Sequence, residues 1–538
     1  MGELMRIKSI CIVGGGSAGW MTAASLNKFT PDINVTLIES PEVSTIGVGE
    51  STLGHFNAFL RAMGIKDEDW MAECNATYKT SIKFTDWNKP GETFHYPFGS
   101  LDFSEAPGGT LDWFNWAARD PDNTKASDFA EFFHPSVSMI DQNKLTKNVY
   151  GEVPGFNFDN DTAYHMDATL FGGFLKENFC DNVTHIQDHI ESIPLDSEGA
   201  VASLVGRKAT YEADLYIDCT GFSAILLDKT LHVPFNNFND VLLNDRACAA
   251  QIPYVDKNKE MESVTNCTAI ENGWVWNIPL YTRLGTGYVY SSKYATEDEA
   301  EEQFRAHLAK TDPKRAEEAE VFHLKIRHGI HEKSWVKNVV GVGLASGFIE
   351  PLESTGLMLT HENILFLIRA LTRRNAQVNK IDVDCFNDSV RTTMEGFRQF
   401  ISQHYAFAGR DDTPYWQAVT NTTTYSKTFE DFALPDTPVL DTFKATAYNL
   451  NIGRGLDETA GLIYILAGQG YNPITAVDAC INDTKFDAFN WEVVKDTYRA
   501  RKKDVQEFID LMPTHYEFLT DEFYLNKEVK TGSVHNGG

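Results

Sequence analysis

The residues with the clearest chemical signature lie near the N-terminus, where a glycine-rich run follows a short apolar segment. Residues 14–19 (GGGSAG) satisfy the pattern G-x-G-x-x-G, and Glu39 follows 20 residues after the last of these glycines. In this pattern the glycines allow a tight turn, a close approach to a pyrophosphate, and helix-to-strand packing. The acidic residue accepts hydrogen bonds from ribose hydroxyls and disfavours a 2′-phosphate. The spacing predicts a dinucleotide site formed by Gly14, Gly16, Ser17, Ala18, Gly19 and Glu39.

Two later segments favour FAD over NAD as the dinucleotide. Residues 214–223 (DLYIDCTGFS) end a strand-like run in small residues and a glycine, which is typical of the second nucleotide-contacting strand of FAD-dependent hydroxylases. Residues 341–355 (GVGLASGFIEPLEST) look like the loop that passes the flavin ring in that group, and they add Gly343 to the candidate set. No second complete G-x-G-x-x-G occurs, so we expect no separate NAD(P)H domain.

The elements that must position these residues begin with a βαβ unit. Residues 7–13 indicate a strand, residues 17–28 a helix and residues 35–39 a second strand. Further segments are predicted as strands at 213–218 and 339–344, and as helices at 297–310 and 356–372.

These elements place the chain in the α/β class, with an FAD-binding module joined to a substrate module. The first module is expected to be Rossmann-like, of the flavin monooxygenase type, and the second to be mixed and mainly helical. We assign residues 1–85, 150–235 and 325–380 to the FAD-binding module, and residues 86–149, 236–324 and 381–530 to the substrate module.

Composition excludes several classes of function. The 538 residues carry 47 Lys+Arg against 76 Asp+Glu, a formal net charge of −29. Proteins that bind nucleic acid or anionic membranes need basic surfaces, so neither partner is expected. No apolar run reaches the ~18–20 residues that span a bilayer. The eight cysteines contain no C-x-x-C pair, so no metal site is expected. We therefore expect a cytoplasmic protein.

Several further motifs together point to a known family. Residues 273–280 read GWVWNIPL and contain W-x-W-x-I-P, residues 47–52 read GVGEST, and residues 349–356 read IEPLESTG. With GGGSAGWM at residues 14–21, AYHMDATLF at residues 163–171 and HYAFAGRDDTPYW at residues 404–416, the chain resembles the flavin-dependent tryptophan halogenases and related indole halogenases. The similarity runs from residue 7 to about residue 416.

The resemblance implies an enzyme that uses FADH2, oxygen and a halide ion, bromide or chloride, to form hypohalous acid. The oxidant would pass Trp274 and Trp276, which line a tunnel, to reach Lys79 beside an indole-type substrate. An ammonium can polarise hypohalous acid, whereas a neutral amine could itself be halogenated, and desolvation permits the second route by lowering the lysine pKa. Lys83 is the nearby competitor, because positions 79, 81 and 83 of one strand share a face. The family motif favours Lys79.

The resemblance also implies roles for the residues around IEPLESTG. Glu353 would stabilise the cationic ring intermediate, orient hypohalous acid or act as a base, with Glu350 as the alternative. Ser354, Thr355 and Gly356 are the candidate halide site.

Two remaining groups complete the candidate site. Gly49 and Glu50 of GVGEST are expected beside the flavin, where Glu50 could instead cap a loop. His95, Tyr96 and Phe98 could form one wall of the ring pocket, since stacking requires flat side chains.

One departure from the family bears on the substrate. Tryptophan-specific members close over the amino-acid end of their substrate with a C-terminal aromatic and carboxylate patch, and no such clamp is recognisable in residues 422–475. A smaller indole or another electron-rich aromatic is therefore favoured over free tryptophan.

Two rival functions use the same nucleotide motifs. A flavin-dependent aromatic hydroxylase needs no lysine of this kind, and a non-catalytic flavin-binding sensor would leave Lys79 and Glu353 without a purpose. For the leading interpretation we expect a separate flavin reductase as a partner, and a homodimer.

Overall fold

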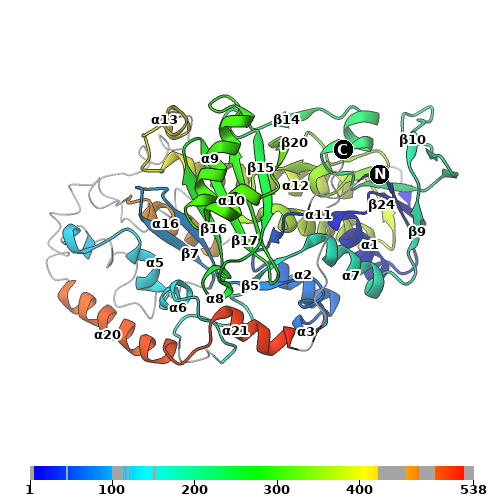
Figure 1. The fold of residues 1–538 in the computed structure, drawn as a ribbon. Coiled ribbons are helices and arrows are strands. Elements are labelled where there is room, and N and C mark those ends of the chain that lie inside the picture. The colour runs from blue at the N-terminus through cyan, green and yellow to red at the C-terminus, as the bar shows by residue number, and fades with distance from the viewer. Residues whose placement is uncertain are drawn as a thin grey trace, which may run out of the picture.

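The computed structural model describes residues 5–43, 47–99, 113, 116–117, 120–148, 153–421, 456–471, 491–525 and 527. Two large sheets lie in different parts of the molecule, with helices packed against each (Figure 1). A single cluster of buried apolar side chains includes Ile10 and Trp20 beside the first sheet and Phe84 and Trp274 in the second. The two parts therefore share one continuous core.

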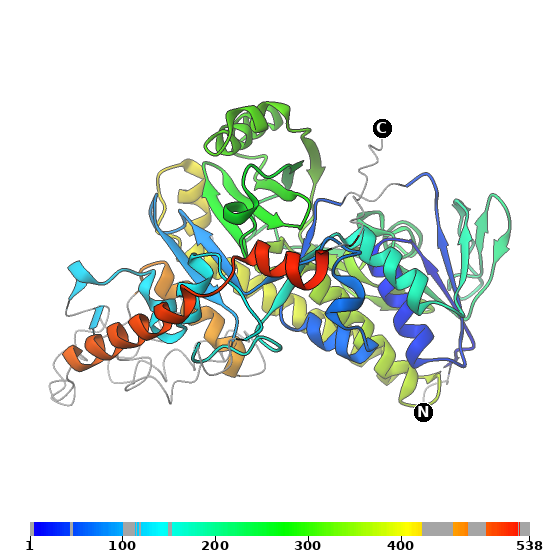
Figure 2. The same cartoon turned by 60° about the horizontal axis from the view of Figure 1, so that its bottom comes forward.

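The nucleotide-binding sheet has six strands. Their order is β21 (Trp335–Val336), β22 (Val339–Gly341), β13 (Leu215–Asp218), β2 (Ser9–Val13), β3 (Asn34–Glu39) and β9 (Thr184–Gln187). All neighbours are parallel except β21 and β22. Parallel strands of this kind need helices on the faces of the sheet. Helices α1 (Ser17–Phe29), α7 (Ala168–Phe179) and α11 (Thr355–Thr372) pack together beside it (Figure 2). The predicted Rossmann-like module is confirmed.

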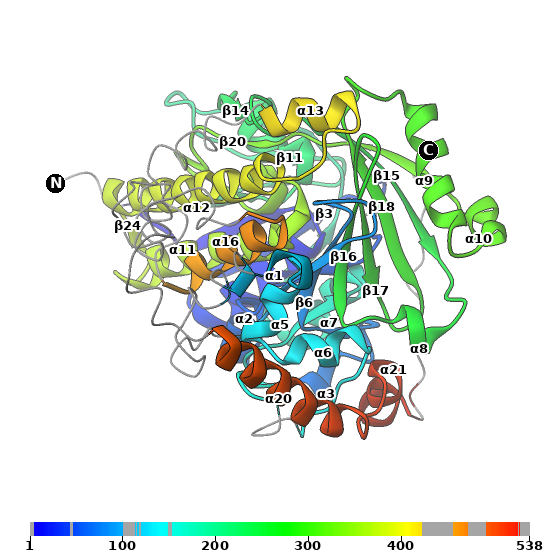
Figure 3. The same cartoon turned by 90° about the vertical axis from the view of Figure 1, so that its left-hand side faces the viewer.

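The second sheet has seven strands. Their order is β19 (Phe322–Lys325), β15 (Arg246–Ile252), β18 (Leu284–Tyr290), β17 (Gly273–Pro279), β16 (Val264–Ile270), β6 (Ser81–Thr85) and β7 (Thr93–Pro97). Helix α9 (Glu297–Ala309) packs on β15 and β18, whereas α5 (Asp128–Phe133) and α16 (Leu456–Gly468) pack on β7 (Figure 3). This part of the molecule therefore combines a large sheet with helices.

A small third sheet joins the two parts. It contains β4 (Glu50–Ser51), β8 (Ala163–Met166) and β5 (Thr77–Lys79) in that order. The chain leaves β5 at Thr80 and enters β6 of the seven-stranded sheet at Ser81. The expectation that residues 79, 81 and 83 share one strand face is therefore wrong: β5 pairs with β8 of the small sheet, whereas β6 pairs with β16 and β7 of the seven-stranded sheet, so Lys79 and Lys83 belong to different sheets.

A long helix links the nucleotide-binding sheet to the second part of the molecule. Helix α12 (Lys380–Ala406) begins at Asn379, whose side chain accepts from the backbone of the first turn. It packs on α11 and approaches β21 and α16. No helix in the described ranges is long and apolar enough to cross a membrane. The boundaries of the two modules stay a prediction.

Candidate active site

The glycine turn after β2 has the geometry of a phosphate-binding loop. Gly14 has φ +114°, and a Cβ there would lie 2.3 Å from the carbonyl oxygen of Cys219 in the neighbouring segment. A Cβ at Gly19 would lie 1.9 Å from the carbonyl oxygen of Gly14, so only glycine lets α1 start so close to the strand. A Cβ at Gly16 would meet nothing within 4 Å. The turn is therefore closed toward the sheet and open at the start of α1.

These features fit an FAD pyrophosphate. Gly16 caps α1 without any side-chain hydrogen bond to the first turn, and a helix N-terminus of this kind stabilises phosphate charge. Ser17 and Ala18 start the helix, and a Cβ at Gly343, which has φ +67°, would lie 3.0 Å from the Ala18 Cβ. The loop after β22 thus closes on the same helix end.

Glu39 ends β3 next to this turn. A Cβ at Gly15 would meet its Oε2 at 1.7 Å, so the carboxylate lies directly against the glycine backbone. Its Oε1 is 2.7 Å from Nε2 of His185 in β9. The sequence pattern placed Glu39 correctly at the end of the strand but did not indicate His185. The role of Glu39 toward ribose stays a prediction.

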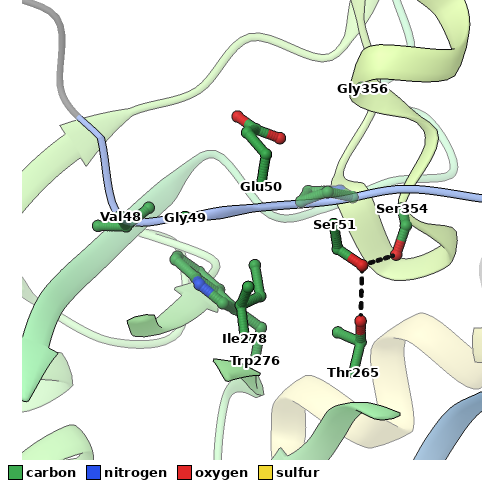
Figure 4. Close-up of a pocket in the computed structure, with 10 residues that line it drawn as sticks. Val48, Gly49, Glu50, Ser51, Thr265, Trp276, Ile278, Ser354 and Gly356 are labelled. Carbon is green, nitrogen blue, oxygen red and sulfur yellow. Dashed lines mark hydrogen bonds between the residues drawn. The ribbon is translucent and has the colours of Figure 1, made fainter. Parts of the chain in front are cut away.

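A cavity of about 90 Å³ lies between the small sheet, the seven-stranded sheet and the start of α11 (Figure 4). Ser51 and Glu50 come from β4, Trp276 and Ile278 from β17, and Ser354 and Gly356 from the start of α11. Its remaining lining residues are Val48, Gly49, Thr265 and Pro351. Motifs distant in the sequence, GVGEST, W-x-W-x-I-P and IEPLESTG, therefore line one space.

Lys79 is completely buried at the end of β5. Its Nζ donates to Ser354 Oγ at 2.6 Å and to the Thr52 carbonyl oxygen at 3.1 Å, and it lies 5.2 Å from the ring centroid of Phe98. Burial disfavours the ammonium and lowers the Lys79 pKa to about 7, although Glu353 acts in the opposite direction. Lys79 can therefore occupy both protonation states near neutral pH.

Glu353 is buried in the short helix η5 (Pro351–Glu353). Its Oε1 lies 2.6 Å from Nε2 of His404, whose Nδ1 is 2.9 Å from the carbonyl oxygen of Phe400. The ring of His404 thus bridges the Glu353 carboxylate and the backbone of α12, which fixes the position of the carboxylate. The sequence analysis quoted His404 only within HYAFAGRDDTPYW and gave it no role.

Glu350, the alternative carboxylate, is also buried but binds a different set of groups. Its Oε2 accepts from Asn244 Nδ2 at 2.9 Å, Trp274 Nε1 at 2.9 Å and Tyr405 OH at 2.7 Å. Three donors on one oxygen are typical of a fixed structural carboxylate. Glu350 therefore holds Trp274, whereas Glu353 is the carboxylate that acts on Lys79.

The candidate halide residues occupy a strained turn at the start of α11. Ser354 has φ 57°, a left-handed conformation that is costly for a residue with a Cβ. Thr355 is buried, and its Oγ1 bonds no described residue. The Oε2 of Glu50 lies 3.9 Å from the Cβ position of Gly356, and burial raises the Glu50 pKa to about 7. A neutral Glu50 would not repel an anion at this helix end.

The three aromatic-loop residues are not equivalent. Phe98 contacts Lys79, as described above. Tyr96 stacks on Tyr464 of α16, with centroids 5.9 Å apart. His95 lies between Ser81 Oγ at 3.1 Å and Asp141 Oδ1 at 3.0 Å. The structure thus brings Phe98 to Lys79, and gives His95 polar partners of its own.

The two tryptophans of W-x-W-x-I-P lie in β17 with ring centroids 6.2 Å apart. Trp276 lines the cavity, and its Nε1 bonds no described residue. Trp274 is fully buried, and its Nε1 donates a hydrogen bond to Glu350. The segment 422–475, where no substrate clamp was recognised, lies outside the described residues except for 456–471.

Comparison with known proteins identifies the family. A family model described as tryptophan halogenase matches residues 9–480. Tryptophan 7-halogenase RebH of Lentzea aerocolonigenes is 35% identical over 77% of this chain and 79% of its own. Tryptophan 6-halogenase SttH of Streptomyces toxytricini is 35% identical over 76% of this chain and 80% of its own.

Solved structures agree with this similarity. The crystal structure of SttH matches with a TM-score of 0.81 at 31% identity, over 95% of this chain and 99% of that one. The apo structure of VirX1 matches with a TM-score of 0.87 at 41% identity, over 96% of this chain and 100% of that one.

These matches favour halogenation over the hydroxylase and sensor alternatives. FADH2 is the reduced cofactor of the family and a halide ion its co-substrate, in agreement with the glycine turn and cavity described above. From its sequence and its fold, the chain belongs to the flavin-dependent tryptophan halogenase family.

Proposed function

We propose that this protein halogenates an electron-rich, indole-type ring through Lys79, with Glu353 as the opposing carboxylate. The observation that carries the proposal is the buried Lys79 ammonium, hydrogen-bonded to Ser354 at the edge of the cavity and influenced by Glu353. An aromatic hydroxylase has no use for a buried lysine in this position.

When bound, FADH2 would supply two of the four electrons that reduce oxygen, and the halide ion would supply the other two as it is oxidised to hypohalous acid. The glycine turn with Gly14, Gly16 and Gly19 would hold its pyrophosphate, and Gly49, Glu50 and Gly343 would lie along the rest of the cofactor. The helix end formed by Thr355 and Gly356 offers donors that suit a halide ion, among them the Thr355 hydroxyl, which bonds no described residue.

Lys79 can bind hypohalous acid in either of its two protonation states. As an ammonium it donates a hydrogen bond that polarises hypohalous acid, and as an amine it can accept the halogen. Glu353 then stabilises the cationic ring or removes its proton. His404 fixes the carboxylate in place through the 2.6 Å contact.

Trp276 and Trp274 would separate the flavin side from the substrate side. Trp276 lines the cavity, and Trp274 is locked behind it by Glu350. Two large rings at this point discourage direct oxygen transfer from the flavin to the substrate. Phe98 and Tyr96 are the aromatic surfaces proposed to contact the ring on the far side of Lys79.

We propose an indole-type substrate and leave bromide and chloride as alternative halides. RebH and SttH are named as tryptophan halogenases, but the absence of a recognisable clamp in the sequence favours a smaller indole for this chain. A separate flavin reductase, a homodimer and a cytoplasmic location complete the proposal.

The test is a reconstituted reaction. The protein is incubated with FAD, a flavin reductase, NADH, oxygen, catalase and a panel containing indole and tryptophan, with bromide or chloride. Products with the isotope pattern of the added halogen are expected by mass spectrometry. Hydroxylated products that form equally without halide would contradict the proposal.

A further inference from the structure

A row of buried polar side chains leads away from Lys79 through Ser354. Lys79 Nζ donates to Ser354 Oγ at 2.6 Å, and Ser354 donates to Ser51 Oγ at 3.0 Å. Ser51 Oγ lies 2.7 Å from Thr265 Oγ1, which lies 2.9 Å from His165 Nε2. We refer to Ser354, Ser51 and Thr265 as the hydroxyl relay. Figure 4 shows its two hydroxyl–hydroxyl contacts.

The far end of the row fixes the direction of every hydrogen bond. Thr77 Oγ1 donates to the Pro279 carbonyl oxygen at 2.6 Å, so it can only accept from His165 Nδ1 at 3.3 Å. His165 therefore carries its proton on Nδ1 and presents a lone pair at Nε2. Thr265 must donate to that lone pair, and Ser51 must donate to Thr265.

The result is a row of donors that all point from the Lys79 ammonium to the His165 lone pair. Its members are no more than 6% exposed, and each hydrogen-bonds the next directly. They come from five different elements or turns, β4, β5, β8, β16 and the start of α11. Buried hydroxyls are costly unless they are paired, and here each one is paired along the same line.

We propose that the hydroxyl relay moves a proton between Lys79 and His165, so that His165 is the temporary acceptor that converts Lys79 into a neutral amine. His165 touches neither cofactor nor substrate, so it is a positioning residue that acts through Lys79. The proposal rests on the function proposed above. It adds that His165 holds the Lys79 proton inside the protein during the reaction.

The protons balance along the row. Lys79 gives one proton to Ser354, whose own proton passes to Ser51, then that of Ser51 to Thr265, and that of Thr265 to His165 Nε2. The amine attacks hypohalous acid: the nitrogen–halogen bond forms, the halogen–oxygen bond breaks, and the released hydroxide takes a proton from the nitrogen and leaves as water.

Transfer of the halogen to the ring closes the cycle. The nitrogen–halogen bond breaks, and the proton that the ring loses returns to the nitrogen, directly or through Glu353. The relay then reverses and His165 restores the Lys79 ammonium. The net reaction consumes hypohalous acid and the aromatic ring and yields the halogenated ring and water.

The surrounding charges place the resting proton on Lys79. Glu353 faces Lys79 and favours its ammonium, and the charge of Lys79 disfavours a proton on His165. Cys267 also faces Lys79 and His515 faces His165, but burial raises the Cys267 pKa well above its usual value and lowers the His515 pKa to about 4, so neither carries a charge near neutral pH. Burial, then the charge of Lys79, hold the His165 pKa well below its usual value. The second of these effects disappears as Lys79 loses its proton, so the transfer becomes less unfavourable as it proceeds.

The row ends inside the protein. Beyond His165 the described residues that continue the row are Thr77 and, through its carbonyl oxygen, Pro279, and that oxygen cannot take a proton onward. His165 can therefore hold a proton and return it.

The test separates the relay from the formation of the oxidant. In His165→Gln the amide keeps hydrogen-bonding capacity but cannot take a proton, and Thr265→Val removes the hydroxyl that donates to His165. Matched controls are Thr265→Ser, which retains the hydroxyl, and Thr268→Val in the same strand, whose side chain lies outside the row.

Each protein is mixed with FADH2, oxygen and bromide, and two yields are measured from pH 6 to 9. One is hypobromous acid captured by a soluble diketone without aromatic substrate, and the other is bromoindole in a single turnover. In His165→Gln and Thr265→Val the rate of bromoindole formation, divided by the amount of captured oxidant, should fall by about 10²-fold or more. The pH at which this rate increases should also shift to a higher value. Both controls should keep the wild-type pH profile.

Two other results would overturn these ideas separately. Wild-type rates and pH profiles in both His165→Gln and Thr265→Val would overturn the relay while the halogenase function stands. Failure of the wild-type protein to form any oxidant would overturn the proposed function itself.

A second measurement needs no variant and therefore no assumption about folding. The single-turnover rate of the wild-type protein is followed in mixtures of H2O and D2O. Several protons moving together should give a curved dependence on the deuterium fraction. A linear dependence, which indicates one moving proton, would overturn the relay.

Discussion

Two lysines only four residues apart lie in very different surroundings. Lys79 is fully buried, and its nearest polar partner is a hydroxyl. Lys83 keeps 17% of its side chain exposed and lies 3.7 Å from Asp141 Oδ1 and 3.5 Å from Glu262 Oε1. The first carries a pKa lowered to about 7, while the second has two carboxylates to hold its charge.

The difference comes from the change of sheet at Thr80 rather than from the lysines themselves. Lys79 lies in the small sheet that faces the cavity, and Lys83 lies in β6 near the edge of the seven-stranded sheet. Thr80, the one residue between β5 and β6, thus separates the buried Lys79 amine from the ion pairs of Lys83. Each prediction below tests one side of this contrast against the other.

The largest effect is expected from removing the amine. Lys79→Met should lower formation of halogenated product by about 10²–10⁴-fold, because no group then holds the oxidant beside the ring. Lys83→Met should halogenate at nearly the wild-type rate. Product is measured by mass spectrometry at equal amounts of captured hypohalous acid. Equal losses in the two variants would show that the contrast has no catalytic meaning.

The second prediction compares the carboxylates that face the two lysines. Glu353→Gln should reduce halogenation by about 10²–10³-fold, since it removes the negative charge that opposes the cationic ring. Glu262→Gln, beside Lys83, should change it little. Single-turnover rates with preformed FADH2 report this step directly. A fully active Glu353→Gln would move the role to Glu350.

The third prediction concerns stability and pH. Lys79 binds its proton more weakly in the folded protein, with a pKa of about 7, than in the unfolded chain, where the ordinary value is 10.5. Between these values the unfolded chain binds more protons, so the contribution of Lys79 to stability rises with pH. Below pH 7 both states are protonated and the contribution is constant.

Denaturant titrations at several pH values measure this effect. The free energy of unfolding of wild type minus that of Lys79→Met should increase from pH 7 toward pH 10. The same difference for Lys83→Met should show no such rise. A flat difference for Lys79→Met would mean that the buried amine keeps its ordinary pKa.

The smallest effect is expected at the ion pair of Lys83. Burial raises the Asp141 pKa, but the hydrogen bond from His95 and the charge of Lys83 outweigh it and leave the pKa below its usual value. Asp141→Asn should cost about 0–1 kcal/mol at neutral pH, because the carboxylate is half exposed. The cost should shrink in high salt and vanish as the pH falls through the pKa of Asp141. A loss of halogenation without loss of stability would instead link His95 to the substrate.

Local patterns in the sequence were enough to predict the nucleotide-binding elements. The strand at residues 9–13, the turn at Gly14 and the helix at residues 17–29 follow from apolar runs and a glycine requirement. The strand predicted at 339–344 ends earlier, at Gly341, because the chain turns into a short helix where Gly343 has φ +67°.

Partners within the site could not be predicted in the same way. His404 contacts Glu353 across 51 residues and Thr265 contacts His165 across 100. Such contacts depend on how separate elements pack, and no spacing rule encodes them. Both histidines stand in segments that carried the family resemblance, AYHMDATLF and HYAFAGRDDTPYW. Asking which side chains in those segments can exchange protons would have singled them out.

Helix α12 gives the two carboxylates of the IEPLESTG turn a common support. Its consecutive residues His404 and Tyr405 contact Glu353 and Glu350 respectively. The helix is 27 residues long, which at 1.5 Å per residue makes a rod of about 40 Å. Insertion of one residue near its end would rotate both side chains by about 100° away from their carboxylates. The register of this helix therefore determines whether His404 and Tyr405 reach the two carboxylates.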